Sequence, residues 1–101
     1  MTDALRLAPD ELMQVREILS HCLPEGVSVR VFGSRASGIP KAWSDLDLAL
    51  QGREALPLSL LALLREAFDE SPLPWKVDLV HYRSVSPEFA AIIDRDSVPL
   101  F

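Results

Sequence analysis

The sequence predicts a small α/β domain in which helices cover a mixed β-sheet mainly on one face. Short runs of alternating apolar residues, typical of strands, are separated by segments whose apolar residues recur at helical spacing. Prolines and glycines fall at the boundaries of these segments. The composition, with 49% hydrophobic and 25% charged residues, is that of a folded globular protein. A length of 101 residues is enough for one domain and too short for two. We therefore expect a single domain over residues 1–101.

The first expected element is a helix that begins at Pro9. Asp10 and Glu11 stand in its first turn, where acidic side chains interact favourably with the helix dipole. Its apolar stripe comprises Leu12, Val15, Ile18, Leu19 and Cys22. Pro24 and Gly26 end the helix.

Two strands and a turn make up the next part of the chain. Valines alternate with polar residues over 27–32, which favours a strand. Residues 33–40 are rich in Gly and Ser and predict a turn or a short helix. The run 45–50, "DLDLAL", predicts the second strand.

A second amphipathic helix is expected within 57–70. Its buried stripe comprises Leu60, Leu61, Leu64, Ala67 and Phe68. Leu58 and Leu63 lie off this stripe, either as surplus leucine or as part of a surface for a partner. A third strand over 75–80 and a short helix from Pro87 follow, and 97–101 closes the chain as an edge strand.

Charge and composition exclude several classes of protein. The net charge is −5 and no run of Lys or Arg occurs, so we expect no direct nucleic-acid surface. The apolar stretches are too short for a membrane span, and the N-terminal residues lack the pattern of a signal peptide. The single cysteine, Cys22, excludes an internal disulfide and fits a reducing compartment. We expect a cytoplasmic protein.

Three aspartates stand out because of their positions in the expected strands. Side chains alternate along a strand, so Asp45 and Asp47 share the face opposite to the leucines of 45–50. Asp78 lies opposite to the apolar set of the third strand in the same way. If the two strands are neighbours, the three carboxylates converge on the open face of the sheet.

Converging carboxylates repel one another. At ~5 Å and an effective dielectric of ~20, each pair costs roughly 3 kcal/mol. Either one pKa rises so that an acid becomes neutral, or cations bind, and oxygen ligands suit Mg²⁺. The plainer alternative is that Asp45 is a turn residue at the start of the strand and that the other two acids simply face water.

The turn before the acids has features of a phosphate site. Gly33 allows a ligand to approach the backbone closely, and Ser34 offers a hydroxyl and an amide at a possible helix start. Arg35 can add positive charge beside a phosphate. The segment lacks the Gly-Lys-Ser/Thr ending of a P-loop.

Gly33-Ser34, ten intervening residues and Asp45-x-Asp47 together resemble the signature of the DNA polymerase β-like nucleotidyltransferases. The form "GSRASG…SDLDLAL" is most similar to the minimal nucleotidyltransferase (MNT) antitoxins encoded beside HEPN-domain toxins. The later "LPWKVDLVHYRSVSPEF" resembles their third-acid strand and the helix that follows, which makes Asp78 the third carboxylate.

The resemblance implies a nucleotidyltransferase fold and a role for each motif residue. Gly33 and Ser34 would hold the β- and γ-phosphates of ATP, with Arg35 beside them. Asp45 and Asp47 would hold two Mg²⁺ ions, and Asp78 would bind one of them and help to activate the acceptor. The implied reaction moves AMP from ATP to a hydroxyl, with a tyrosine of the HEPN toxin as the expected acceptor.

One residue departs from the pattern, and two other functions stay open. Ser37 stands where many relatives have a second basic residue, which would weaken the hold on phosphate unless a partner supplies the charge. The first alternative is a non-catalytic, nucleotide-binding antitoxin that neutralises its HEPN partner by contact. The second, a transferase acting on a small molecule, is disfavoured because the chain has little beyond the expected sheet and its helices.

Overall fold

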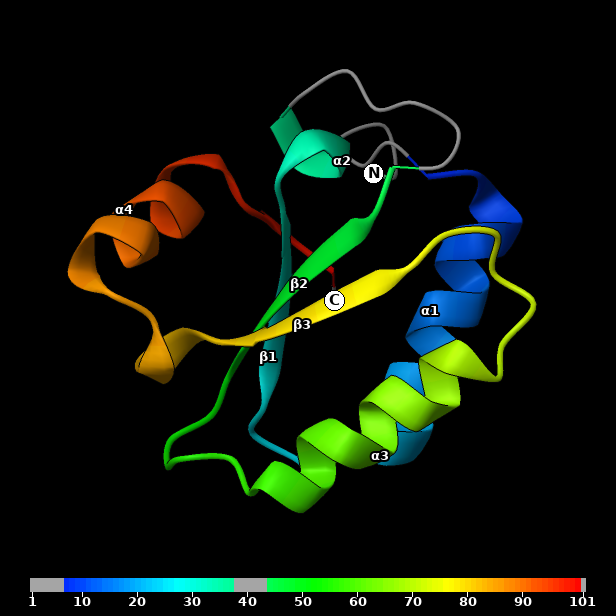
Figure 1. Cartoon of the computed structure of the whole chain (residues 1–101), viewed down its shortest axis with the longest axis horizontal. Coiled ribbons are helices and arrows are strands. Elements are labelled where there is room, and N and C mark those ends of the chain that lie inside the picture. The colour runs from blue at the N-terminus through cyan, green and yellow to red at the C-terminus, as the bar shows by residue number, and fades with distance from the viewer. Residues whose placement is uncertain (1–6, 38–43, 101) are drawn as a thin grey trace.

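Helices and strands alternate along the chain in the computed structural model, which describes residues 7–37 and 44–100 (Figure 1). In chain order the elements are α1 (Pro9–Cys22), β1 (Ser28–Phe32), α2 (Ser34–Ser37), β2 (Leu46–Gln51), α3 (Leu58–Asp69), β3 (Val77–His81), the 3₁₀ turn η2 (Tyr82–Ser84), α4 (Pro87–Asp96) and β4 (Val98–Pro99). The expected α/β order is confirmed, and strand boundaries differ from expectation by one or two residues. Within the expected turn at 33–40, residues 34–37 form α2, and 38–40 lie outside the described residues.

The four strands form one mixed sheet in the order β3-β2-β1-β4. β1 runs antiparallel to both β2 and β4, whereas β2 and β3 are parallel. The expected edge strand at the C-terminal end is confirmed, although β4 has only two residues. The amide of Leu100 extends this edge by donating to the carbonyl of Val29 at 3.0 Å. The parallel pairing of β2 with β3 decides where the acidic side chains meet.

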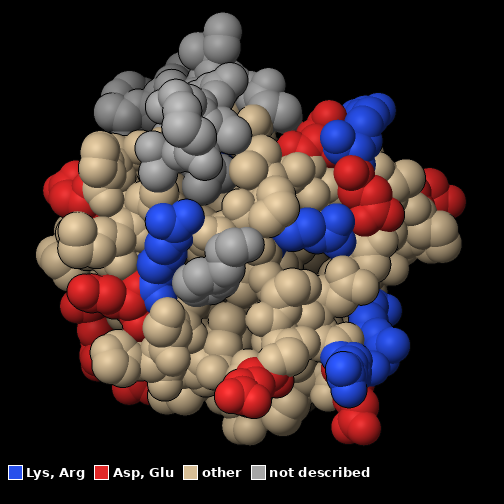
Figure 2. All heavy atoms as spheres, turned by 180° about the vertical axis from the view of Figure 1, so that it is seen from behind, with Lys and Arg blue, Asp and Glu red and all other residues tan. Residues whose placement is uncertain are grey.

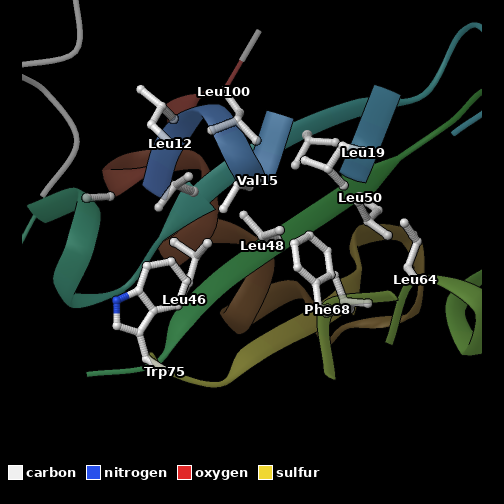
Figure 3. Close-up of a cluster of buried hydrophobic side chains, with 14 of the residues drawn as sticks. Leu12, Val15, Leu19, Leu46, Leu48, Leu50, Leu64, Phe68, Trp75 and Leu100 are labelled. Carbon is white, nitrogen blue, oxygen red and sulfur yellow. The ribbon is translucent and has the colours of Figure 1, made fainter. Parts of the chain in front are cut away.

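Helices α1 and α3 cover one face of the sheet and enclose the main hydrophobic core (Figures 1 and 3). The leucines of β2 point into this core, as the alternation predicts. The other fully buried side chains come from α1, β1, α3 and the C-terminal end. Their burial supplies about 1.5–3 kcal/mol for each large aliphatic side chain. The fully buried members of this core are Val15, Leu19, Val31, Leu46, Leu48, Leu50, Leu64 and Leu100.

The edges of the two helical stripes are less buried than their centres. Ile18 and Cys22 of α1 are only partly buried, and so is Leu60 of α3. All three still pack against the core. The spacing therefore predicted the correct helix faces. Leu58 and Leu63, which the spacing placed off the stripe, are 83% and 51% exposed.

Helix α4 packs on the opposite face of the sheet (Figure 1). Its fully buried Ile93 forms a second, smaller apolar cluster with Phe32 and Ala49. The helix starts at a true cap, because the Ser86 hydroxyl accepts a hydrogen bond from the Phe89 amide at 3.2 Å. The second face is therefore partly covered, as the expectation of helices mainly on one face allows.

A polar network ties α4 to the sheet. Arg30 Nη1 donates to Asp94 Oδ1 at 3.0 Å, and the Tyr82 hydroxyl donates to both oxygens of that carboxylate at 2.9 and 2.7 Å. The Arg30 guanidinium also lies over the Tyr82 ring, 4.8 Å from its centroid. The Tyr82 hydrogen bond is the main cause that holds the pKa of Asp94 below its ordinary value. These contacts fix the position of α4 on this face of the sheet.

The surface of the described residues offers no broad basic area on the face seen from behind. Lys and Arg side chains are scattered there among acidic and uncharged ones (Figure 2). None of the helices within residues 7–37 and 44–100 combines the length and the apolar character needed to cross a membrane.

Candidate active site

The backbone places Asp47 and Asp78 side by side. In the parallel pairing of β2 with β3, Asp47 is the register partner of Asp78. Neighbouring strands lie about 4.8 Å apart, and paired residues project from the same face. The flanking register pair, Leu48 and Leu79, points into the core on the other face. The expected pairing of the two strands is therefore confirmed, and it makes Asp47 and Asp78 neighbours.

Asp45 lies just before β2 and is exposed, as is Asp78, whereas Asp47 is half-buried. The amide of Leu46, between the two β2 acids, donates to the Lys76 carbonyl at 2.9 Å and pins the start of β2 to β3. Burial first, then the negative charges of Asp78 and Asp45, raise the pKa of Asp47 from 3.8 to about 6. The carboxylates of Asp45 and Asp78 therefore both act electrostatically on Asp47.

Gly33 forms the turn that joins β1 to α2, directly beside these acids. Its φ is +77°, a conformation that glycine adopts without strain. A Cβ atom added here would collide with Oδ2 of Asp47. Phe32, the residue before Gly33, is the register partner of Asp47 in β1. The glycine is therefore required both by the turn and by the close approach of the acid.

Ser34 follows as the first residue of α2, so the Gly33–Ser34 turn opens against the acidic end of the sheet. The Ala36 amide donates to the Gly33 carbonyl at 3.1 Å, which closes the turn. Ser34 is partly exposed. A hydroxyl and a tight backbone turn next to a pair of carboxylates form an arrangement that can hold phosphate oxygens and cations together.

Arg35 occupies a different environment from the one expected for a phosphate contact. Its side chain is 4% exposed. Its Nε donates to the Ser44 carbonyl at 3.0 Å, and its guanidinium carbon lies 4.7 Å from the centroid of the Trp75 ring. The expected contact of Arg35 with a nucleotide stays a prediction, while the structure shows this residue inside the protein.

The residues present fit a magnesium ion. Within residues 7–37 and 44–100, the side chains as they stand provide no ready-made group of three His, Cys, Asp or Glu ligands. The register nevertheless fixes the backbones of Asp47 and Asp78 side by side, and carboxylates reorient about their side-chain torsions. Mg²⁺ needs only one or two carboxylates, with water and phosphate oxygens completing its octahedron. After burial, the negative charges of Asp78 and Asp45 raise the pKa of Asp47, and a bound cation relieves this repulsion.

Several other side chains noted in the sequence lie elsewhere or have structural roles. His81 lies at the far end of β3, opposite Leu50, and its Nδ1 is 3.1 Å from the Ser84 hydroxyl oxygen. Trp75 is buried, as expected of a packing residue. Lys41, Trp43 and the other residues of 38–43 lie outside the described residues. A surface pocket of about 400 Å³ lies along α1 around Met13, on the opposite side of the sheet from the acids. The carboxylates and the turn, and not this pocket, define the candidate site.

Two features of the site have no clear signal in the sequence. One is the contact of Arg35 with Trp75, because nothing in either segment indicates that the two meet. The other is the aromatic pair beside Asp47, where Phe32 and Phe89 pack edge to face with ring centroids 5.7 Å apart. Strand alternation places Phe32 on the acidic face, but only the position of α4 brings Phe89 to it.

Comparisons with known proteins identify the family of the chain. Residues 12–100 match the family model described as "Nucleotidyltransferase domain". The chain is 43% identical over 91 residues to a probable protein adenylyltransferase, MntA, of Haemophilus influenzae, and the match covers 90% of this chain and 79% of the relative.

Two solved structures of toxin–antitoxin complexes share the fold. One, determined with AMP-PNP, matches with a TM-score of 0.74 and 24% identity over 89% of this chain and 72% of that one. In the other, a tri-AMPylated HEPN toxin of Shewanella oneidensis is in complex with an MNT antitoxin, and the TM-score is 0.61 at 23% identity over 90% and 69% of the two chains. At these identities the likeness concerns the fold. With the family model and the MntA match, the chain belongs to the nucleotidyltransferase domain family, and within it resembles the minimal nucleotidyltransferases of HEPN/MNT toxin–antitoxin pairs.

Proposed function

We propose that this chain transfers AMP from ATP to a hydroxyl group of a partner HEPN protein, with a tyrosine as the acceptor, and that it thereby acts as an antitoxin. One observation supports the proposal most strongly. Asp47, the register partner of Asp78, lies directly against the Gly33 turn, so the proposed cation ligands and the proposed phosphate-binding turn lie at one end of the sheet. The MntA relative, named a probable protein adenylyltransferase, and the AMPylated HEPN toxin held by an MNT antitoxin support it.

Each residue of the site has a part in the proposed reaction. Gly33 and Ser34 bind the β- and γ-phosphates. Asp45 and Asp47 hold two Mg²⁺ ions, and Asp78 shares one of them. When bound, these ions supply positive charge that offsets the negative charge developing around the α-phosphate. The side chains thus hold the triphosphate and the acceptor in line, which is the main requirement of nucleotidyl transfer.

The bonds and protons of the step balance without a further reactant. The acceptor oxygen forms a bond to the α-phosphorus, while the bond from that phosphorus to the oxygen bridging it to the β-phosphate breaks. Pyrophosphate leaves, and the hydroxyl proton passes to the exposed carboxylate of Asp78. A carboxylate in reach of the acceptor is the general base that such a transfer needs.

The test measures the mass of the partner. The purified HEPN partner is incubated with this protein, ATP and Mg²⁺ and is then weighed by mass spectrometry. We expect a gain of one or more AMP units, which Asp45→Asn and Asp47→Asn abolish. Asp69→Asn is the matched control, because Asp69 is an exposed acid at the end of α3, remote in the fold from the turn. A partner that is bound and inhibited but gains no mass would instead favour the non-catalytic antitoxin.

A further inference from the structure

A buried guanidinium lies where the three segments of the candidate site meet. Arg35 is the buried charged residue of the described part of the chain, with 4% of its surface exposed. Burial of a charged group costs several kcal/mol unless its hydrogen bonds are made. The contacts that Arg35 makes next to the proposed active site therefore indicate its role.

The contacts of Arg35 reach the segments that directly precede β2 and β3. Its Nε donates to the carbonyl of Ser44, the residue directly before Asp45. Its guanidinium stacks on Trp75, three residues before Asp78. Arg35 itself is the second residue of α2 and follows directly on the Gly33–Ser34 turn. One side chain therefore links the turn, the start of β2 and the approach to β3.

The ring that receives the guanidinium is itself fixed. Trp75 is 7% exposed and belongs to the main core. Figure 3 shows its indole beside Leu46, the fully buried residue between Asp45 and Asp47. The platform under Arg35 is thus packed against β2 at the position of the acids. Any displacement of Arg35 or Trp75 is transmitted to those carboxylates through well-packed atoms.

We propose that Arg35 is a positioning residue, which holds Asp45, Asp47 and Asp78 at the spacing that a divalent cation requires, and that it does not bind the nucleotide phosphates. The inference rests on the proposed function only in taking these acids as cation ligands. An arginine suits this task because its planar group stacks on a ring and donates a directed hydrogen bond at the same time. Lysine keeps the charge but cannot do both.

The two possible roles of Arg35 predict different measurements. A phosphate ligand affects KM for ATP and leaves the binding of metal alone unchanged. A positioning residue affects the binding of metal without nucleotide, because the spacing of the acids is altered before ATP arrives. Residues that orient metal ligands typically change metal affinity 10- to 100-fold when they are mutated.

The experiment measures Mn²⁺ affinity by electron paramagnetic resonance, without nucleotide, in Arg35→Lys, Trp75→Leu and the double variant. We expect each single variant to bind Mn²⁺ about tenfold more weakly, and the double variant to be no worse than either, because both disrupt one contact. Arg95→Lys is the control, since Arg95 is exposed on α4. Trp75→Phe keeps a ring under the guanidinium and is expected to restore binding. Amide hydrogen exchange around Ser44 in the metal-free protein should quicken in the weak binders only.

Three outcomes distinguish a positioning role of Arg35 from phosphate binding and from a failure of the proposed function. Unchanged Mn²⁺ affinity in folded Arg35→Lys, with a raised KM for ATP, would overturn the inference and make Arg35 a phosphate ligand. If Arg35→Lys does not fold, equal Mn²⁺ affinity in Trp75→Leu and Trp75→Phe would overturn it. If the wild-type protein binds Mn²⁺ and the variants weaken it, yet no AMP reaches the partner, the proposed function fails and the positioning role stands.

Discussion

Replacement of Asp47 by asparagine should make the metal-free protein more stable, and only at neutral pH. The pKa of Asp47 is raised from 3.8 to about 6, by burial and by the charges of Asp78 and Asp45. The folded state therefore binds a proton more tightly than the unfolded state. Between pH 4 and pH 6 the folded state holds more protons, so stability falls as the pH rises through this window. An asparagine side chain at this position does not ionise, so the variant escapes this loss.

The magnitude follows from the size of the pKa change. A rise of about two pKa units corresponds to about 3 kcal/mol of differential interaction. Asp47 is only half-buried, and solvent screens part of this energy, so we expect a gain of about 1–2 kcal/mol above pH 6.5. For a domain of this size, such a gain raises Tm by roughly 4–16 °C.

The assay is urea denaturation in the presence of EDTA, from pH 4 to pH 8, of the wild-type protein, Asp47→Asn and the control Asp69→Asn. The stability difference between Asp47→Asn and wild type should grow in favour of the variant from pH 4 to pH 6.5, and by more than the difference between Asp69→Asn and wild type. Asp78→Asn should give part of the gain, because it removes one of the two charges. A difference for Asp47→Asn that does not change with pH would refute the electrostatic coupling of the acids.

Two further substitutions test the turn and helix α4, each with a neighbouring or matching control. Gly33→Ala should destabilise the fold by at least about 1–2 kcal/mol and abolish AMP transfer, because the added methyl group collides with Asp47. Gly26→Ala is the control, since Gly26 is also at positive φ but has open space around it, and this variant should keep the activity. Equal activity in both variants would contradict this role of Gly33. Ile93→Ala should lower the free energy of unfolding, measured by urea denaturation, by about 2–4 kcal/mol because Ile93 is fully buried. Ile92→Ala should lower it by less than about 1 kcal/mol, because Ile92 is 50% exposed. Similar losses in the two variants would mean that α4 does not pack as described.

The sequence predicted the faces of the sheet well, because alternation along a strand has a fixed period. The leucines of β2 are all fully buried and Asp47 lies on the other face, as the parity requires. The sequence did not determine which strands are neighbours, since the alternation of side chains along each strand is the same for any pairing of strands. Only the observed register shows that Asp47 meets Asp78. The pairing of β2 with β3 is therefore the observation that identifies these acids as a candidate site.

The sequence did not predict the burial of Arg35 or its contact with Trp75. Its place after Gly33-Ser34 suggested that it adds positive charge beside a phosphate, because the local sequence contains no sign of a distant aromatic partner. The contact with Trp75 joins residues 40 positions apart, and such a contact depends on tertiary packing. The position of Phe89 beside Phe32 was not predictable from the sequence for the same reason, since it depends on where α4 packs on the sheet.

The most direct test of the account is a crystal structure with a non-hydrolysable ATP analogue and Mn²⁺, in which anomalous scattering locates the metal. We expect an anomalous peak within bonding distance of carboxylate oxygens of Asp47 and at least one of Asp45 and Asp78, with the triphosphate on the Gly33–Ser34 turn. Bound nucleotide without metal between these acids, or a triphosphate held elsewhere on the protein, would contradict it.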